Sequence, residues 1–363
     1  MTNSESTKSK VIDWLRYFCV VMVVLLHAVG SPSDGHDAIA YQNGVYDTFR
    51  ILFSEGLCRV AVPVFFIISG YLFFVRLEEW DNAVWIQKLR KRAKTILVPY
   101  LLWNIIAICF SLIMLYPIFL LEGGDAPDMA GWYQRIGGIR AFWDAAGGAP
   151  INYPLWFIRD LMVFVLLSPV IYLYVKRTAL VGLAVFYALY FLDFLPAIPG
   201  LSAEGLFFFI LGAYFATRRI DFTAVYKKIR FPALVLACPL VIAMVMTYGN
   251  QDDLWGYARR LFTFFGSASV IGIATSLFDR RRIKLNALLS NSSFFVYAAH
   301  GTIVLPIMQF LLGKTLPGNQ FGLTLCYFAA PLLTIVVLVL CYHYLCKWMP
   351  GTASVLTGGR GEK

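Results

Sequence analysis

The chain has 363 residues, of which 59% are hydrophobic, 16% aromatic and only 14% charged. Soluble domains carry about 25% charged residues, so this composition excludes an ordinary soluble protein and predicts a polytopic membrane protein. The formal charge of +10 does not indicate a nucleic-acid partner, because the basic residues follow the loops of a membrane topology. The seven cysteines form no disulfide framework or CxxC metal spacing, and we interpret them as small apolar residues.

The first predicted span, residues 11–30, carries Asp13, Arg16 and His27. A charged side chain at the centre of a membrane helix costs about 2.5–3.5 kcal/mol, so such residues are functional candidates. Arg16 and His27 lie eleven positions apart, which places them on one helix face about 16 Å apart. Imidazole is the commonest general base. Two structural alternatives stay open: His27 bonded to a neighbouring helix, and Arg16 snorkelling beside Asp13.

Apolar runs of about 17–25 residues predict the membrane spans. We expect ten, at residues 11–30, 57–75, 96–120, 154–175, 179–195, 203–217, 232–249, 256–277, 290–312 and 321–346. With the N-terminus in the cytoplasm, 22 of the 31 basic residues lie in inner segments and 8 in outer segments. This asymmetry predicts an all-α polytopic protein with both termini cytoplasmic. The expected domains are an N-terminal tail (1–10), a membrane domain (11–347) and a C-terminal tail (348–363).

On the predicted inner side, a basic run enters the third span. Lys91, Arg92 and Lys94 suit the phosphates of a cytoplasmic donor, but a positive-inside signal or anionic lipid binding explains them as well. Ser69 and Gly70 in the second span allow close helix packing.

On the predicted outer side, the Gly-, Asp- and Trp-containing loop 121–153 suits either a sugar-binding surface or an interfacial aromatic belt. Arg159 and Asp160 are adjacent, so on a helix they point about 100° apart, and we expect each to need a separate partner. Glu204 opens the sixth span. In the ninth span Tyr297 and His300 share one face at i, i+3, and without a carboxylate cluster the histidines make no metal site.

Together these segments resemble the acyltransferase-3 family of membrane proteins. The first-span pattern of that family is roughly Asp-x-Leu-Arg, ten residues, then His, which matches Asp13-Trp-Leu-Arg16 and His27. The resemblance continues through the motifs Phe65-Phe-Ile-Ile-Ser-Gly-Tyr71, Lys91-Arg-Ala-Lys-Thr-Ile-Leu-Val-Pro-Tyr100, Leu155-Trp-Phe-Ile-Arg-Asp-Leu161 and Tyr297-Ala-Ala-His300. Where many members have Arg-x-x-Arg, this chain has Lys91-x-x-Lys94, and we expect it to be the membrane module without the hydrolase-like domain that some members append.

The resemblance implies a bacterial inner-membrane enzyme that moves an acetyl or succinyl group from cytoplasmic acyl-CoA to a hydroxyl of an envelope glycan or lipid-linked sugar. It implies that His27 is the base or acyl relay and that Arg16, with Asp13, lies on the donor path. We further expect donor-side and acceptor-side residues and no bound cofactor or metal. The donor-side candidates are Lys91, Arg92, Lys94, Ser69 and Tyr71; the acceptor-side candidates are Trp156, Arg159, Asp160, Glu204, Tyr297 and His300.

A proton-coupled transporter of envelope precursors is the rival hypothesis, because ten spans with buried Arg and His suit a carrier as well. A structural scaffold leaves the polar first span unexplained. Release of CoA by the purified protein distinguishes the enzyme from the carrier.

Overall fold

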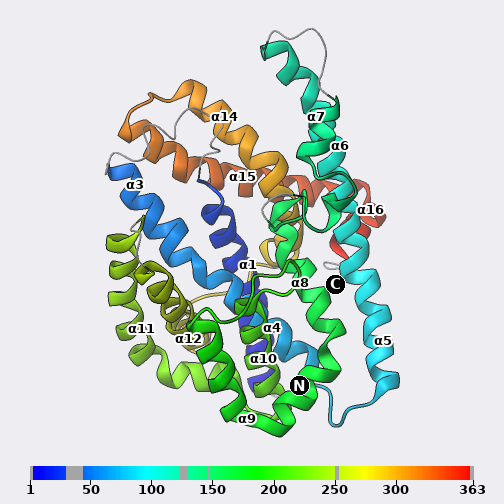
Figure 1. Ribbon diagram of the computed structural model, residues 1–363, viewed down its shortest axis with the longest axis vertical. Coiled ribbons are helices and arrows are strands. Elements are labelled where there is room, and N and C mark those ends of the chain that lie inside the picture. Colours follow the sequence, from blue (N-terminus) through cyan, green and yellow to red (C-terminus); the bar gives the residue numbers. More distant parts are fainter. Residues whose placement is uncertain (1–2, 30–43, 123–128, 146–147, 250–252, 360–363) are drawn as a thin grey trace.

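The computed structural model describes residues 3–29, 44–122, 129–145, 148–249 and 253–359, and these residues form helices and no strand (Figure 1). The α-helices are α1 (Asn3–Leu26), α3 (Val45–Arg50), α4 (Ala61–Phe74), α5 (Asn82–Arg92), α6 (Val98–Glu122), α7 (Met129–Arg135), α8 (Trp156–Leu166), α9 (Ser168–Phe191), α10 (Ala203–Thr217), α11 (Phe222–Thr247), α12 (Leu254–Asp279), α13 (Ala287–Ala299), α14 (Leu305–Thr315), α15 (Gln320–Trp348) and α16 (Pro350–Thr357). Short π-helical or 3-10 segments join them: η2 (Ile51–Gly56), η3 (Leu57–Val60), η4 (Ala93–Leu97), η5 (Gly138–Phe142), η6 (Tyr153–Leu155) and η7 (His300–Val304).

In the described part of the chain, seven helical stretches are long and apolar enough to cross a membrane. They are Val45–Phe74, Asn82–Met114, Ser168–Phe191, Phe222–Thr247, Leu254–Asp279, Ala287–Thr315 and Gln320–Trp348. Large apolar side chains on α11 face outward, with Val235 70% and Met246 75% exposed, as expected of a surface in contact with lipid acyl chains. The chain is therefore a multi-pass helical membrane protein.

The expectation of ten spans differs from these seven mainly in three places. Helix α1 carries charged residues and is not among the seven, and the apolar helix α10 has only 15 residues. The stretch α9 counts as one of the seven but consists of two helices that meet at a kink, because Ala179 has non-helical angles (φ 51°, ψ −132°). The hydroxyl of Tyr174 donates to the carbonyl of Gly182 across the kink at 2.7 Å, and the kink lies at the boundary that the sequence predicts between two spans.

Helix α1 runs through the middle of the molecule and packs against α4, α12, α13 and α15 (Figure 1). Its buried face consists of apolar side chains, among them Leu15, Cys19, Val23 and Val24. Two further pairs of helices pack closely together, α4 with α10 and α11 with α12. The polar residues of α1 are thereby held at the centre of the fold.

Glycines allow the closest helix crossings. A side chain at Gly70 of α4 would collide with the carbonyl of Phe209 in α10, and one at Gly212 of α10 would collide with the carbonyl of Ile67 in α4. Small residues at a crossing let two backbones approach in the absence of a hydrophobic driving force within lipid. The packing interpretation of Gly70 is confirmed.

The two predicted tails are both helical where they are described. Helix α1 begins at Asn3, and Lys8 forms an ion pair with Asp221, the N-cap of α11, at 2.8 Å. Burial opposes the charge on Lys8, but the hydrogen bond and charge of Asp221 raise the pKa of this ammonium group. Burial likewise opposes the Asp221 charge, yet hydrogen bonds from Lys8 and Thr223 hold the pKa of the carboxyl group below its usual value. Both charges therefore persist, and they fix the first turns of α1.

Candidate active site

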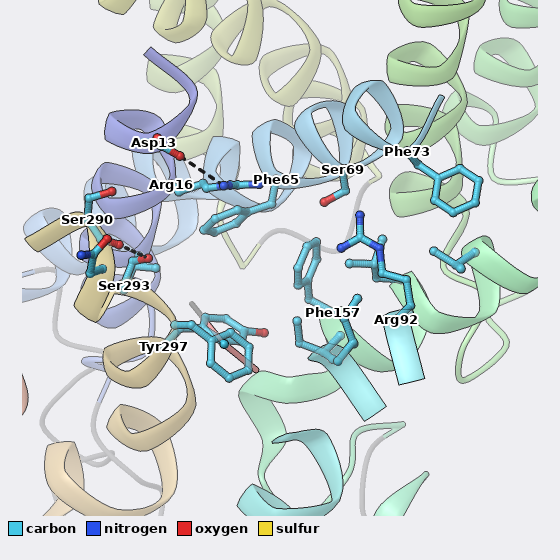
Figure 2. Close-up of a pocket in the computed structure, with 18 residues that line it drawn as sticks. Asp13, Arg16, Phe65, Ser69, Phe73, Arg92, Phe157, Ser290, Ser293 and Tyr297 are labelled. Carbon is cyan, nitrogen blue, oxygen red and sulfur yellow. Dashed lines mark hydrogen bonds and ion pairs between the residues drawn. The ribbon is translucent and has the colours of Figure 1, made fainter. Parts of the chain in front are cut away.

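A cavity of about 330 Å³ lies beside α1 and receives two arginine side chains (Figure 2). Arg16 of α1 donates a hydrogen bond to the carboxylate of Asp13 at 3.2 Å. This is the contact that we expect if Arg16 snorkels beside Asp13. Arg92, from the end of α5, has no hydrogen bond or ion pair with the described residues, and it is close enough to Arg16 for their charges to repel. Two neighbouring guanidinium groups and one nearby carboxylate make this cavity attractive to an anionic group.

Polar and aromatic side chains complete the cavity wall. Ser69 of α4 faces it, as do Ser290, Asn291 and Ser293 at the start of α13. The sequence analysis missed the three α13 residues, although a Ser-Asn-Ser-Ser run at the beginning of an apolar span is itself a signal. The aromatic lining consists of Phe65, Phe73, Phe157, Phe294 and Tyr297.

The predicted donor-side residues separate into two groups. Arg92 and Ser69 line the cavity, whereas Lys91 and Lys94 are exposed and do not line it. Tyr71 also lies elsewhere: its hydroxyl accepts a hydrogen bond from Lys8 at 3.3 Å, and its ring packs against Phe222.

His27 and His300 are 273 positions apart in the chain and form a direct pair. His27 Nδ1 lies 2.9 Å from His300 Nε2, and the two ring planes are nearly parallel, at 13°, with centroids 5.2 Å apart. His27 follows the last residue of α1 but keeps the helical hydrogen bond of its backbone N–H to Val23 at 3.1 Å. His300 is fully buried and opens the π-helical segment η7, a local widening of the kind that often accompanies functional sites.

The hydrogen bonds assign the proton of each ring in the neutral pair. His300 Nδ1 lies 2.8 Å from the carbonyl oxygen of Tyr297 and 3.2 Å from that of Val296. A carbonyl oxygen only accepts, so Nδ1 of His300 carries the proton and its Nε2 is an acceptor. The proton between the rings then sits on Nδ1 of His27, which leaves Nε2 of His27 with a free lone pair. That nitrogen has no hydrogen-bond partner among the described residues, so it is free to accept a hydrogen bond.

Tyr297 connects the cavity to the histidine pair. Its ring lines the cavity, its backbone carbonyl holds His300, and its hydroxyl donates to the carbonyl of Pro154. Phe65, Phe157 and Tyr297 contact one another, with centroids 5.4 to 6.4 Å apart. We call these three residues the aromatic cluster. His27 and His300 do not line the cavity, so the cluster lies where the cavity ends on the histidine side.

Arg159 and Asp160 correct one expectation. The two side chains pair directly: Arg159 Nε and Nη2 donate to Asp160 Oδ1 at 3.1 and 2.9 Å. The prediction that they need separate partners is wrong because the long arginine side chain folds back across the angle between neighbouring positions. Both are at most 3% exposed.

These two residues also tie separate elements together. Arg159 Nη1 donates to the carbonyls of Trp143 and Gly148 at 2.5 and 2.7 Å, and Asp160 Oδ2 accepts from the backbone N–H of Ser202 at 3.0 Å. This geometry fixes the described part of the 121–153 loop and the beginning of α10. Residues 123–128 and 146–147 of that loop lie outside the described residues.

The other predicted acceptor-side residues occupy different surroundings. The Trp156 ring packs against Phe66 with centroids 6.4 Å apart. Glu204 accepts from Arg259 at 2.9 Å. Arg59, which the sequence analysis did not select, is a charged neighbour of His27 and pairs with Glu55.

Comparison with known proteins identifies the class to which this fold and site belong. The model of an acyltransferase domain, acyltransferase family 3, matches residues 10–343, so the chain belongs to this family and is a membrane acyltransferase. The chain is also 30% identical to the succinoglycan biosynthesis protein ExoH of Rhizobium meliloti (strain 1021) over 366 residues, which cover 98% of this chain and 94% of that protein. No solved structure matches the chain. These matches favour the acyltransferase over the rival transporter.

Proposed function

We propose that this protein transfers an acetyl or succinyl group from acyl-CoA to a hydroxyl group of a cell-envelope polysaccharide or a lipid-linked sugar, with His27 as general base. The observation that carries the proposal is the cavity with two arginines that ends at Tyr297, whose carbonyl orients the His300–His27 pair. The similarity to a succinoglycan biosynthesis protein supports a polysaccharide or its precursor as the acceptor.

The cavity suits the acyl-pantetheine end of the donor. Ligand pockets have volumes of about 300–1,000 Å³, and this one, at about 330 Å³, is at the small end. The nucleotide part of CoA therefore stays outside, where the exposed Lys91 and Lys94 offer charge to its phosphates. Arg92 and Arg16 then bind the anionic or carbonyl groups that enter the cavity.

The chemistry follows from the free lone pair of His27. Nε2 of His27 takes the proton of the acceptor hydroxyl while its oxygen attacks the thioester carbonyl. The new C–O bond forms, the C–S bond breaks, and the CoA thiolate leaves and takes up a proton. His300 holds the His27 ring in the tautomer that makes this possible and is a positioning residue.

The proposed orientation of the protein in the membrane separates the donor from the acceptor. The basic loops support an orientation in which the N-terminus, Lys91 and Lys94 face the cytoplasmic side of a bacterial inner membrane, where acyl-CoA is found. His27, at the other end of α1, then faces an acceptor that arrives from the outer side.

Replacing His27 with Ala tests the mechanism. We expect loss of acyl transfer to envelope polysaccharide, measured by mass spectrometry of glycans from cells that carry the variant, while the protein still accumulates in the membrane. His343→Ala is the matched control, because His343 is exposed on α15, and it should transfer normally. Acyl transfer retained by His27→Ala would refute the role of His27.

A further inference from the structure

Three arginine–carboxylate pairs gather with aromatic rings around the beginnings of α10 and α12. Arg259 of α12 pairs with Glu204 of α10 at 2.9 Å, and Arg260 pairs with Asp193, which follows α9, at 2.6 Å. The third pair, Arg59 with Glu55, comes from η2 and η3. Segment η3, which carries Arg59, packs against α12, which carries Arg259 and Arg260, so the pairs belong to one cluster, which we call the arginine–carboxylate cluster.

The cluster lies near the proposed catalytic base. Arg59 belongs to η3, which packs against α1, the helix that His27 follows, and the charge of Arg59 acts on His27. The guanidinium of Arg259 lies over the Trp255 ring at 5.6 Å, and that of Arg260 lies over Tyr257 at 5.8 Å. Flat aromatic and guanidinium surfaces of this kind are suited to stacking against a sugar ring.

Several polar atoms of the cluster are buried without a hydrogen-bond partner among the described residues: Arg59 Nε, Glu204 Oε1, Trp255 Nε1 and Arg260 Nε. Each unsatisfied buried polar atom is costly, so such atoms normally find a partner. Three of the four are donors and one is a carboxylate acceptor. A hydroxyl group both donates and accepts, so a ligand with several hydroxyls matches this set.

The charges decide between a neutral and an anionic ligand. Each of the three arginines already faces a carboxylate, so the cluster has no excess positive charge to attract a phosphate or a uronic acid. The unpaired atoms themselves are covered, but the side chains of Arg59, Glu204 and Arg259 are 21 to 32% exposed, so a small rotation of these side chains brings their unpaired atoms to a ligand at the surface.

We propose that the arginine–carboxylate cluster is the acceptor subsite and binds a neutral, hydroxyl-rich sugar unit beside His27. This inference rests on the proposed transferase function and names the surface that selects its acceptor. Glu204 accepts hydrogen bonds from sugar hydroxyls, Arg59 and Trp255 donate to them, and Trp255 and Tyr257 flank the sugar ring.

The test uses the purified full-length protein in nanodiscs, with acetyl-CoA or succinyl-CoA as donor. The acceptor probe is a set of acyl-free oligosaccharides prepared from the envelope polysaccharide of cells that lack this gene. Glu204→Gln and Arg259→Gln should each raise the KM for the oligosaccharides at least about ten-fold relative to any change in the KM for acyl-CoA. Asp279→Asn, which neutralises a carboxylate paired with Lys227 at the other end of α12, is the matched control and should change neither constant.

Competing sugars test whether the subsite prefers a neutral sugar to an anionic one. Methyl β-D-glucoside should inhibit oligosaccharide-dependent CoA release more strongly than glucuronate; stronger inhibition by glucuronate overturns the assignment of a neutral sugar. An unchanged oligosaccharide KM in both variants, or equal changes in both KM values, overturns the subsite and leaves the cluster a structural one. If the unmodified protein releases no CoA from either donor, the transferase proposal itself fails, which is a separate outcome.

Discussion

His300→Ala is the sharpest test of the histidine pair. In the structure Nε2 of His300 accepts a hydrogen bond from the Nδ1–H group of His27 at 2.9 Å, and Nδ1–H of His300 donates to the Tyr297 carbonyl at 2.8 Å. Removing the imidazole leaves the Nδ1–H group of His27 without its acceptor. The His27 ring then loses both its fixed orientation and the preference for the tautomer that frees Nε2.

The magnitude is bounded from two sides. General-base catalysis contributes about 10²–10⁴-fold, and an effect that acts through His27 cannot exceed that total. Leaving a buried donor unsatisfied costs about 1–3 kcal/mol, which corresponds to about 5–150-fold in rate. We therefore expect His300→Ala to lower kcat by about 10–100-fold with little change in the KM for acyl-CoA.

The assay is CoA release by the purified protein with a saturating acceptor, together with thermal melting in detergent to check folding, because His300 is fully buried. His300→Gln keeps an acceptor oxygen on a side chain of related length and should recover part of the rate. In a His27→Ala background the His300→Ala change should cost nothing further.

Two results would refute the reasoning. One is a folded His300→Ala protein whose kcat stays within about two-fold of the unmodified value, well below the expected loss. The other is full additivity of the two changes, which would mean that His300 acts independently of His27.

Three further predictions concern the cavity, a helix crossing and the first helix. Arg92→Ala should raise the KM for acyl-CoA about ten-fold or more through the loss of a charge-assisted contact, whereas Arg90→Ala, an exposed neighbour on α5, should not. Gly212→Val forces a side chain of α10 against the carbonyl of Ile67 in α4. The substitution should destabilise the protein by about 1–3 kcal/mol or more, which a lower melting temperature would show. The Lys8–Asp221 pair should stabilise the protein at neutral pH. Because the pKa of Lys8 is raised, the stability that the pair contributes is lost only as the pH rises above about 10.5. Because the pKa of Asp221 is lowered, the same stability is lost on the acid side only below about pH 3.8. Asp221→Asn keeps the helix cap, so its melting deficit should be constant between these limits and shrink at acid pH.

The sequence predicted the helical membrane fold and several local features because these depend on periodicity and composition. Apolar runs placed α10 at residues 203–217, the same bounds as in the structure. The i, i+3 spacing put Tyr297 and His300 on one face, and there the Tyr297 carbonyl holds the His300 ring. Polar residues in an apolar span singled out Arg16 and His27, and Arg16 lines the cavity.

The pairing of His27 with His300 could not be predicted in the same way. The two residues belong to helices that are 273 positions apart, and spacing rules operate only within one element. The arginine–carboxylate cluster was missed for a related reason: Arg59 and Arg259 were counted among the basic residues of the outer segments, and only tertiary packing joins them to Glu55 and Glu204. Arg159 and Asp160 show the limit of the angular rule, which describes where Cβ atoms point and not how far a long side chain reaches.

The position of the aromatic cluster explains why the cavity and the base are separated. Phe65, Phe157 and Tyr297 line the end of the cavity while Tyr297 holds the histidine pair through His300. Under the proposed mechanism, an acyl group bound beside Arg16 passes these rings to meet a hydroxyl at His27. Rings at this point would then exclude water from the thioester until an acceptor is in place, so we expect the same three residues that lengthen the path to favour transfer to a sugar over hydrolysis.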